Sequence, residues 1–214
     1  MIGTINEILN LSDEKKILLQ LKANPYFKKI GKKEFLKIAY KGAACGKEIA
    51  QQLSRRFPNA SLHEVLKQLD IQYKLEPLTC EENFISLATF QTPNEITVNK
   101  LIIDNNGKYY EKYQVECFNP CFWIDIVTAH ELFHYFQEQE PNLFVNTYKL
   151  PLWRLGPYVH ATKLEILSEV AAMAFAQEFL KLPFYPGLLD QLLIYPSYPE
   201  RAKETLKELL KEAS

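Results

Sequence analysis

The segment TAHELFHYF, residues 128–136, carries the most informative pattern of residues in the chain. His130, Glu131 and His134 make the pattern H-E-x-x-H. Because side chains four residues apart share one face of a helix, the two imidazoles can reach a single metal ion with little strain. Glu131 stands next to His130, where its carboxylate can reach a water on that ion. The segment therefore predicts a helix that binds a metal and carries a general base.

The surroundings of the motif predict that this helix is buried. It is expected from Trp123 to about Glu140, where Pro141 ends it. The apolar residues that flank the motif are Ile124, Ile126, Val127, Ala129, Leu132, Phe133 and Phe136. Two of the chain's only 4 histidines are spaced correctly around a glutamate in this apolar setting, which favours a metal site over structural histidines.

A catalytic zinc site needs a third protein ligand and an open fourth position. The extended pattern H-E-x-x-H-x-x-G-x-x-H fails, because positions 137 and 140 are glutamine and glutamate. A second helix, expected at about 158–181, carries Glu165 and Glu169 on one face. We favour Glu169, which lies deeper in the apolar stretch and needs a partner there. Glu165 remains the alternative, as a ligand or as an acceptor that orients a histidine.

Two further residues near the start of that helix are weaker candidates. His160 could be an alternative ligand, and both His160 and Tyr158 could donate to an oxyanion during catalysis. The simpler interpretation, a surface or loop-packing role for both, stays open.

The composition predicts an ordinary globular chain. Hydrophobic residues make up 47% and charged residues 24% of the 214 residues, values that exclude disorder and coiled coil. This length predicts one compact unit, with a helical N-terminal part over 1–70 and the motif-bearing part over 71–214. Lys+Arg (25) and Asp+Glu (26) nearly cancel, so no strong field attracts nucleic acid or an anionic membrane. A pair of helices expected within residues 44–70 leaves DNA binding open as a further hypothesis.

The pattern of apolar residues and turns predicts an α+β chain, mostly helical, with a small mixed or antiparallel sheet. Helices are expected after Ser12, around 35–39, over 47–57, after the Ser61–Glu64 capping box, and over 200–212. Strands are expected at 71–75, 84–90 and 96–99, a turn at 105–107, and a proline-punctuated loop at 141–157. No signal peptide or membrane-length apolar run is found, which predicts a cytoplasmic protein with reduced thiols at Cys45, Cys80, Cys117 and Cys121.

Taken together, these features resemble those of a known family. The order of a helical part, a small sheet, T-x-A-H-E-L-x-H and an acidic residue ahead of F-A-x-x-F-L is similar to the ImmA/IrrE-type metallopeptidases, within the gluzincin class. The resemblance is carried by Thr128, Ala129, His130, Glu131, Leu132, His134, Glu169, Ala172, Phe175, Ala176, Phe179 and Leu180. It implies a zincin-like fold, zinc held by His130, His134 and Glu169, and Glu131 as general base.

We therefore expect a cytoplasmic zinc metallopeptidase that binds Zn²⁺ and cleaves a protein or peptide, a regulatory protein among the candidates. Neither nucleic acid nor membrane is expected as a partner, and the sequence leaves the oligomeric state open. The alternative is a catalytically inactive zincin-like protein that binds or regulates. Phe133 stands where the family usually has glycine, and Ala171-Ala172-Met173 replaces the usual E-A-N.

Overall fold

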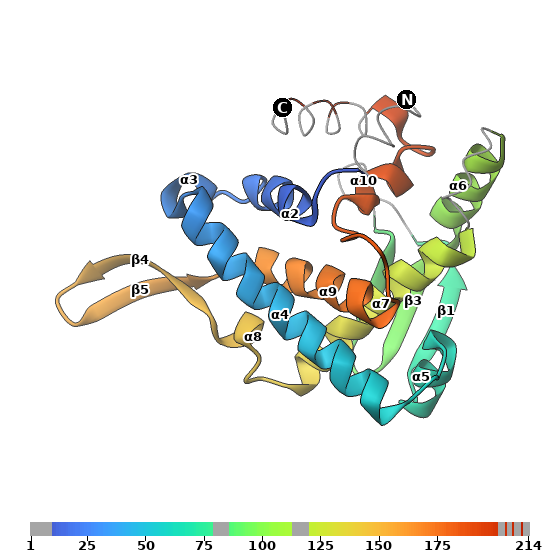
Figure 1. Ribbon diagram of the computed structural model, residues 1–214, viewed down its shortest axis with the longest axis horizontal. Helices are drawn as coiled ribbons and strands as arrows, with labels where there is room; N and C mark the ends of the chain where they lie inside the picture. The colour runs from blue at the N-terminus through green and yellow to red at the C-terminus, as the bar shows by residue number, and fades with distance from the viewer. Residues whose placement is uncertain are drawn as a thin grey trace.

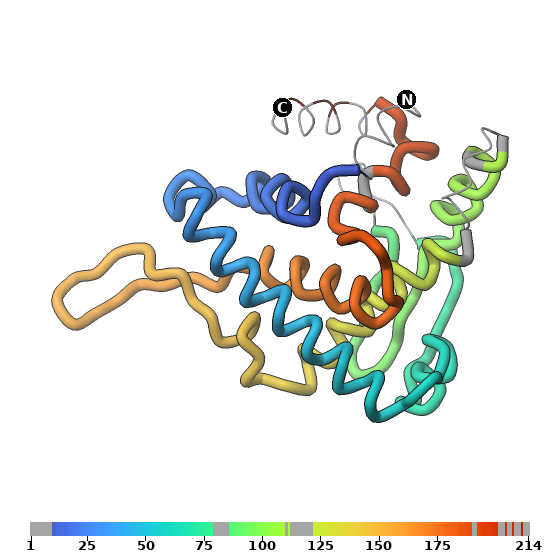
Figure 2. The backbone as a smooth tube through the Cα atoms, viewed as in Figure 1, coloured from blue at the N-terminus to red at the C-terminus, as the bar shows by residue number. Residues whose placement is uncertain are grey.

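The computed structural model describes residues 10–78, 86–112 and 120–200, together with residues 204, 207 and 211. The chain is a mixed α+β protein in which helices predominate (Figure 1). A three-stranded sheet lies against the helices, and a two-stranded hairpin projects away from them, as the backbone trace also shows (Figure 2).

Among the described residues, the N-terminal part contains the helices α2 (Asp13–Lys22), α3 (Phe27–Ile30), α4 (Lys32–Arg56) and α5 (Leu62–Gln68). The hydroxyl of Ser12 accepts a hydrogen bond from the backbone N–H of Lys15 and caps α2. At α5 both bonds of the capping box between Ser61 and Glu64 are present. Both predicted helix starts are confirmed, because side-chain capping is encoded within three residues.

Helix α4 corrects the prediction of two separate helices at 35–39 and 47–57. It runs unbroken through Gly42 and Gly46, which face helix α9 (Ile166–Phe179). A Cβ on Gly46 would meet the carbonyl oxygen of Ala171 at 2.0 Å, and one on Gly42 would meet that of Leu167 at 3.2 Å. The glycines do not break the helix; they allow its backbone to approach α9, beside which it lies in Figure 1.

The sheet has the strand order β1-β3-β2, formed by β1 (Gln72–Glu76), β2 (Ala88–Gln91) and β3 (Glu95–Asn99). Strands β1 and β3 are parallel, whereas β2 and β3 are antiparallel. The predicted small mixed sheet is confirmed, although residues 84 and 85 of the expected strand lie outside the described residues. Helix α7 (Pro120–Gln139) packs against β2, where the ring of Tyr135 contacts that of Phe90. The predicted motif helix is thus confirmed.

The predicted turn at 105–107 is wrong, because helix α6 (Lys100–Lys112) runs through it. The side-chain amide of Asn106 donates to the carbonyls of Ile102 (2.7 Å) and Leu193 (2.6 Å). Leu193 belongs to α10 (Leu189–Ile194), which is distant in sequence. A tertiary partner therefore accepts a hydrogen bond from the amide nitrogen of an asparagine whose local preference is a turn.

The predicted loop at 141–157 and the first turns of the predicted helix at 158–181 are also wrong. After the short helix α8 (Phe144–Thr147), the chain forms the antiparallel hairpin β4 (Lys149–Leu155) and β5 (Tyr158–Lys163). Gly156, with a φ of 59°, and Pro157 form its turn. Strand β5 carries the aromatic and β-branched residues Tyr158, Val159 and Thr162, which favour a strand, whereas the prolines at 151 and 157 favoured a loop in the sequence.

The main core draws on both predicted parts of the chain. Leu21 and Ala50 lie in the same buried cluster as Ala129 and Phe175. Within the described residues, no helix combines the length and apolarity that spanning a bilayer requires. Cys45 is a free thiol, whereas the thiols of Cys80, Cys117 and Cys121 and most of the expected helix at 200–212 lie outside the described part.

Substituting Gly46→Ala tests the close approach of α4 to α9. Helix propensity alone favours alanine by about 1 kcal/mol. Because the new Cβ would collide with the carbonyl of Ala171, we expect instead a loss of about 2 kcal/mol in the free energy of unfolding. Chemical denaturation measures it. Lys41→Ala, at an exposed position of the same helix, should change stability by less than about 0.5 kcal/mol. A Gly46→Ala protein as stable as wild type would contradict the packing.

Fluorescence tests the hairpin, because the chain's two tryptophans differ in burial. Trp153 on β4 is 53% exposed and Trp123 on α7 is 1% exposed. In Trp153→Phe the remaining emission should shift to shorter wavelength and resist quenching by acrylamide. The wild-type protein, with Trp153 in place, should be quenched readily. Equal quenching of both proteins would mean that residue 153 is not on an exposed arm.

Candidate metal centre

Helices α7 and α9 bring His130, His134 and Glu169 together. The Nε2 atoms of the two histidines are 3.1 Å apart. One carboxylate oxygen of Glu169 lies 3.3 Å from Nε2 of His130, and the other lies 3.8 Å from Nε2 of His134. One donor atom from each of the three residues lies within 4.8 Å of the other two. We call these three residues the metal group.

The spacing within the metal group suits one zinc ion. Ligand atoms at about 2.0–2.1 Å from a tetrahedral zinc are about 3.3 Å from one another. The three measured separations bracket this value. Two imidazole nitrogens and one carboxylate are also a donor set that zinc takes in catalytic sites, where the fourth position stays open. The metal group could therefore hold one ion.

The metal group is buried on the histidine side and open on the carboxylate side. The side chains of His130 and His134 are 11% and 20% exposed, whereas that of Glu169 is 47% exposed. Burial by itself would raise the pKa of Glu169, but the hydrogen bond and charge of His130 and the charge of His134 together lower it. The carboxylate is thus held ionised, in the form that binds a cation, at a position that a solvent molecule can reach.

Glu131 follows His130 on α7 and is partly buried. Burial raises the pKa of its carboxyl group, against the opposing effect of His130 and His134. The backbone N–H of Phe90 on β2 donates to this carboxylate. The carboxyl group therefore lies between the metal group's helix and the sheet, with an increased affinity for a proton.

A hydrogen-bonded network holds the other side of His134. Its Nδ1 lies 3.0 Å from the amide oxygen of Gln137, which also accepts a bond from the hydroxyl of Ser168. The amide nitrogen of Gln137 donates to the side-chain oxygen of Asn146 at 2.9 Å. None of these three residues was predicted from the sequence to contact the site. The spacing of three residues between His134 and Gln137 on a helix is the one signal that could have identified a contact.

The structure separates the remaining candidates from the metal group. Glu165 precedes α9, its side chain is 74% exposed, and it pairs with Lys163 at 3.4 Å. Tyr158 and His160 are exposed on the hairpin, where both rings contact Trp153. Of the two carboxylates on the predicted helix, Glu169 is the one brought to the histidines. Sequence periodicity could not decide this, because the helix begins eight residues later than predicted.

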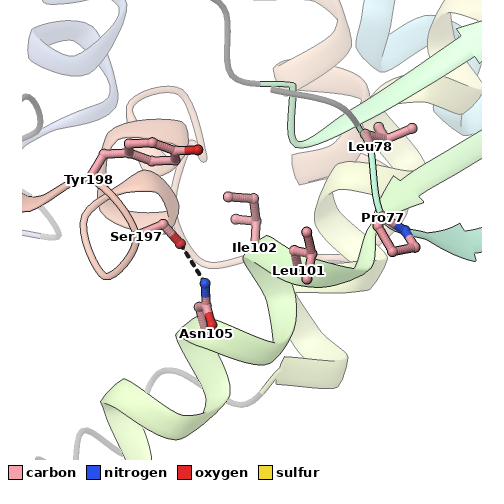
Figure 3. A pocket seen from close by; sticks show the side chains of 7 residues that line it. All are labelled: Pro77, Leu78, Leu101, Ile102, Asn105, Ser197 and Tyr198. Atoms are coloured by element: carbon pink, nitrogen blue, oxygen red, sulfur yellow. Dashed lines mark hydrogen bonds between the residues drawn. The ribbon is translucent and has the colours of Figure 1, made fainter. Parts of the chain in front are cut away.

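A pocket of about 540 Å³ lies elsewhere, between the start of α6 and the turn after α10 (Figure 3). Its lining combines apolar residues with a few polar groups: Pro77, Leu78, Leu101, Ile102, Asn105, Ser197 and Tyr198. The amide of Asn105 donates to the hydroxyl of Ser197 across it at 3.0 Å. None of the lining residues belongs to the metal group, so the pocket is a separate feature.

Comparison with known proteins finds no family model, no curated protein and no solved structure that matches this chain.

Proposed function

We propose that the protein is a zinc-dependent metallopeptidase with a zincin-like fold. The observation that carries this proposal is the metal group itself, three donor atoms at zinc spacing, with Glu131 on the same helix as both histidines. His130, His134 and Glu169 would hold Zn²⁺. A motif helix beside a mixed sheet, with the third donor on a later helix, supports this proposal.

A zinc ion held there would polarise the scissile carbonyl and lower the pKa of a water toward about 7. Glu131 acts as the general base: it takes the proton from the attacking water and passes it to the leaving amine. The raised pKa of Glu131 suits this double role, because the group must both accept and release a proton near neutral pH.

The sheet supports a peptide as the substrate. Strand β2 stands at the edge of the three-stranded sheet, and its outer side has no strand partner among the described residues. Phe90, whose N–H contacts Glu131, belongs to this strand. An extended peptide can add to such an edge through backbone hydrogen bonds. The scissile bond of a peptide bound there would lie near Glu131.

Elemental analysis of protein purified without chelator tests the metal site. We expect about one zinc per wild-type chain and a marked loss in Glu169→Ala, because two histidines alone leave the site without its third ligand. Glu165→Ala is the matched control on the same segment and should keep its zinc. No zinc in wild type after zinc is added back, or equal zinc in Glu169→Ala, would overturn the assignment.

Hydrolysis tests the general base separately from the metal. Glu131→Gln keeps the size of the side chain but cannot take a proton, so it should retain zinc and lose about 100-fold or more in the rate of hydrolysis. Fluorescein-labelled casein, an unstructured protein, is a suitable first substrate. A Glu131→Gln protein that cleaves as fast as wild type would exclude this mechanism. A zinc-loaded wild type that cleaves neither casein nor a peptide library would favour the inactive binding protein.

A further inference from the structure

The network behind His134 fixes which of its ring nitrogens carries the proton. A contact of 3.0 Å between Nδ1 and Oε1 of Gln137 does not settle this alone, because either amide orientation fits a side chain by shape. The orientation of the Gln137 amide must therefore be set by a group that can only donate or only accept a hydrogen bond. Backbone carbonyls are such groups, and two of them stand at the far end of the network.

Two backbone carbonyls orient the side-chain amide of Asn146 on α8. One end of its side-chain amide lies 2.8 Å from the carbonyl oxygen of Gln137 and 3.0 Å from that of Glu140. Carbonyl oxygens only accept hydrogen bonds, so the atom that faces them must be the NH₂ group. The amide oxygen of Asn146 therefore faces the other way, toward the side chain of Gln137.

The amide oxygen of Asn146 in turn orients Gln137. The oxygen of Asn146 only accepts, so the group 2.9 Å from it must be the NH₂ of Gln137. The oxygen of Gln137 consequently faces Nδ1 of His134, and it can only accept as well. Nδ1 must carry a proton, and in the neutral ring the lone pair stands on Nε2, which faces His130 and Glu169. Reversing the amide of Asn146 would place its oxygen against two carbonyl oxygens. Reversing the amide of Gln137 would place its oxygen against that of Asn146.

From these contacts we infer that Gln137 and Asn146 form a relay that transmits the polarity of two backbone carbonyls to His134 and presets the tautomer able to bind a metal. Gln137 is a positioning residue, and Asn146 acts through it. The role in metal binding rests on the proposed function, whereas the tautomer does not. Ser168 donates to the same oxygen of Gln137 and directly precedes Glu169, so one amide oxygen connects both ligand-bearing helices.

The tautomer can be measured in the metal-free protein by NMR correlation of the ring nitrogens and carbons of ¹⁵N-labelled histidine. The measurement is made near pH 9, above the ordinary pKa of histidine of about 6.5. Wild-type His134 should be protonated on Nδ1. The double variant Gln137→Glu/Asn146→Ala should preserve this state, because its carboxylate still accepts from Nδ1 and no Asn146 oxygen opposes it. Gln137→Leu should lose the preference, and Gln139→Leu, the same change at an exposed position of α7, should not.

Asn146→Ala distinguishes a relay from a merely structural role. Asn146 bonds Gln137, which in turn contacts His134, and its removal leaves the Gln137 amide without an imposed orientation. We expect both tautomers of His134 to appear, with circular dichroism unchanged. Zinc affinity, measured by competition with a chelator, should fall about 10–100-fold in Gln137→Leu and stay near wild type in Gln139→Leu.

Three results would overturn the relay: a wild-type His134 protonated on Nε2, a tautomer unaffected by both Gln137→Leu and Asn146→Ala, or an equal zinc affinity for Gln137→Leu and wild type. If wild type shows the Nδ1–H form and yet binds no zinc, the metallopeptidase proposal fails while the tautomer assignment stands. The two failures are thus distinguishable.

Discussion

The close approach of helix α9 to α4 is the constraint on which the rest of the structure depends. Gly46 leaves room for the backbone of Ala171, and the buried alanines of α9 keep that helix thin. On its other side α9 packs against α7, the helix that carries the motif. A helix held from two sides can place Glu169 within 3.3 Å of His130, although this residue is only in the first turn of α9. A wider spacing between α4 and α9 at Gly46 would therefore shift Glu169 relative to the two histidines.

The parts of the fold that the sequence predicted are those encoded over a few residues. The cap at Ser12, the capping box at Ser61 and the amphipathic or alternating stretches each depend on neighbours in the chain. The errors arise where distant residues decide. The glycines of α4 look like helix breakers until α9 is placed against them, and Asn106 looks like a turn until Leu193 accepts its hydrogen bond. The hairpin was missed because the prolines in its sequence favoured a loop.

The same distinction applies to the metal group. Two histidines four residues apart on a helix must share a face, so their proximity follows from the sequence alone. The choice between Glu165 and Glu169 depends on where α9 begins, which is decided by the hairpin before it. The contacts of Phe90, Asn146 and Ser168 with the site come from β2, α8 and α9, and no periodicity in the sequence reports them.

The connection between the two ligand-bearing helices is anchored to α7 near both of its ends. Its beginning is anchored by Asn146, which bonds the end of α7 through the carbonyls of Gln137 and Glu140. Its end is anchored by Ser168, which bonds the side chain of the same Gln137. Both anchors meet at one residue of α7, so the chain between them can extend as an exposed hairpin without moving Glu169. The geometry of the metal group thus depends on the two ends of this connection and is independent of the length between them, which is why a spacing of 35 residues from His134 to Glu169 still closes into one site.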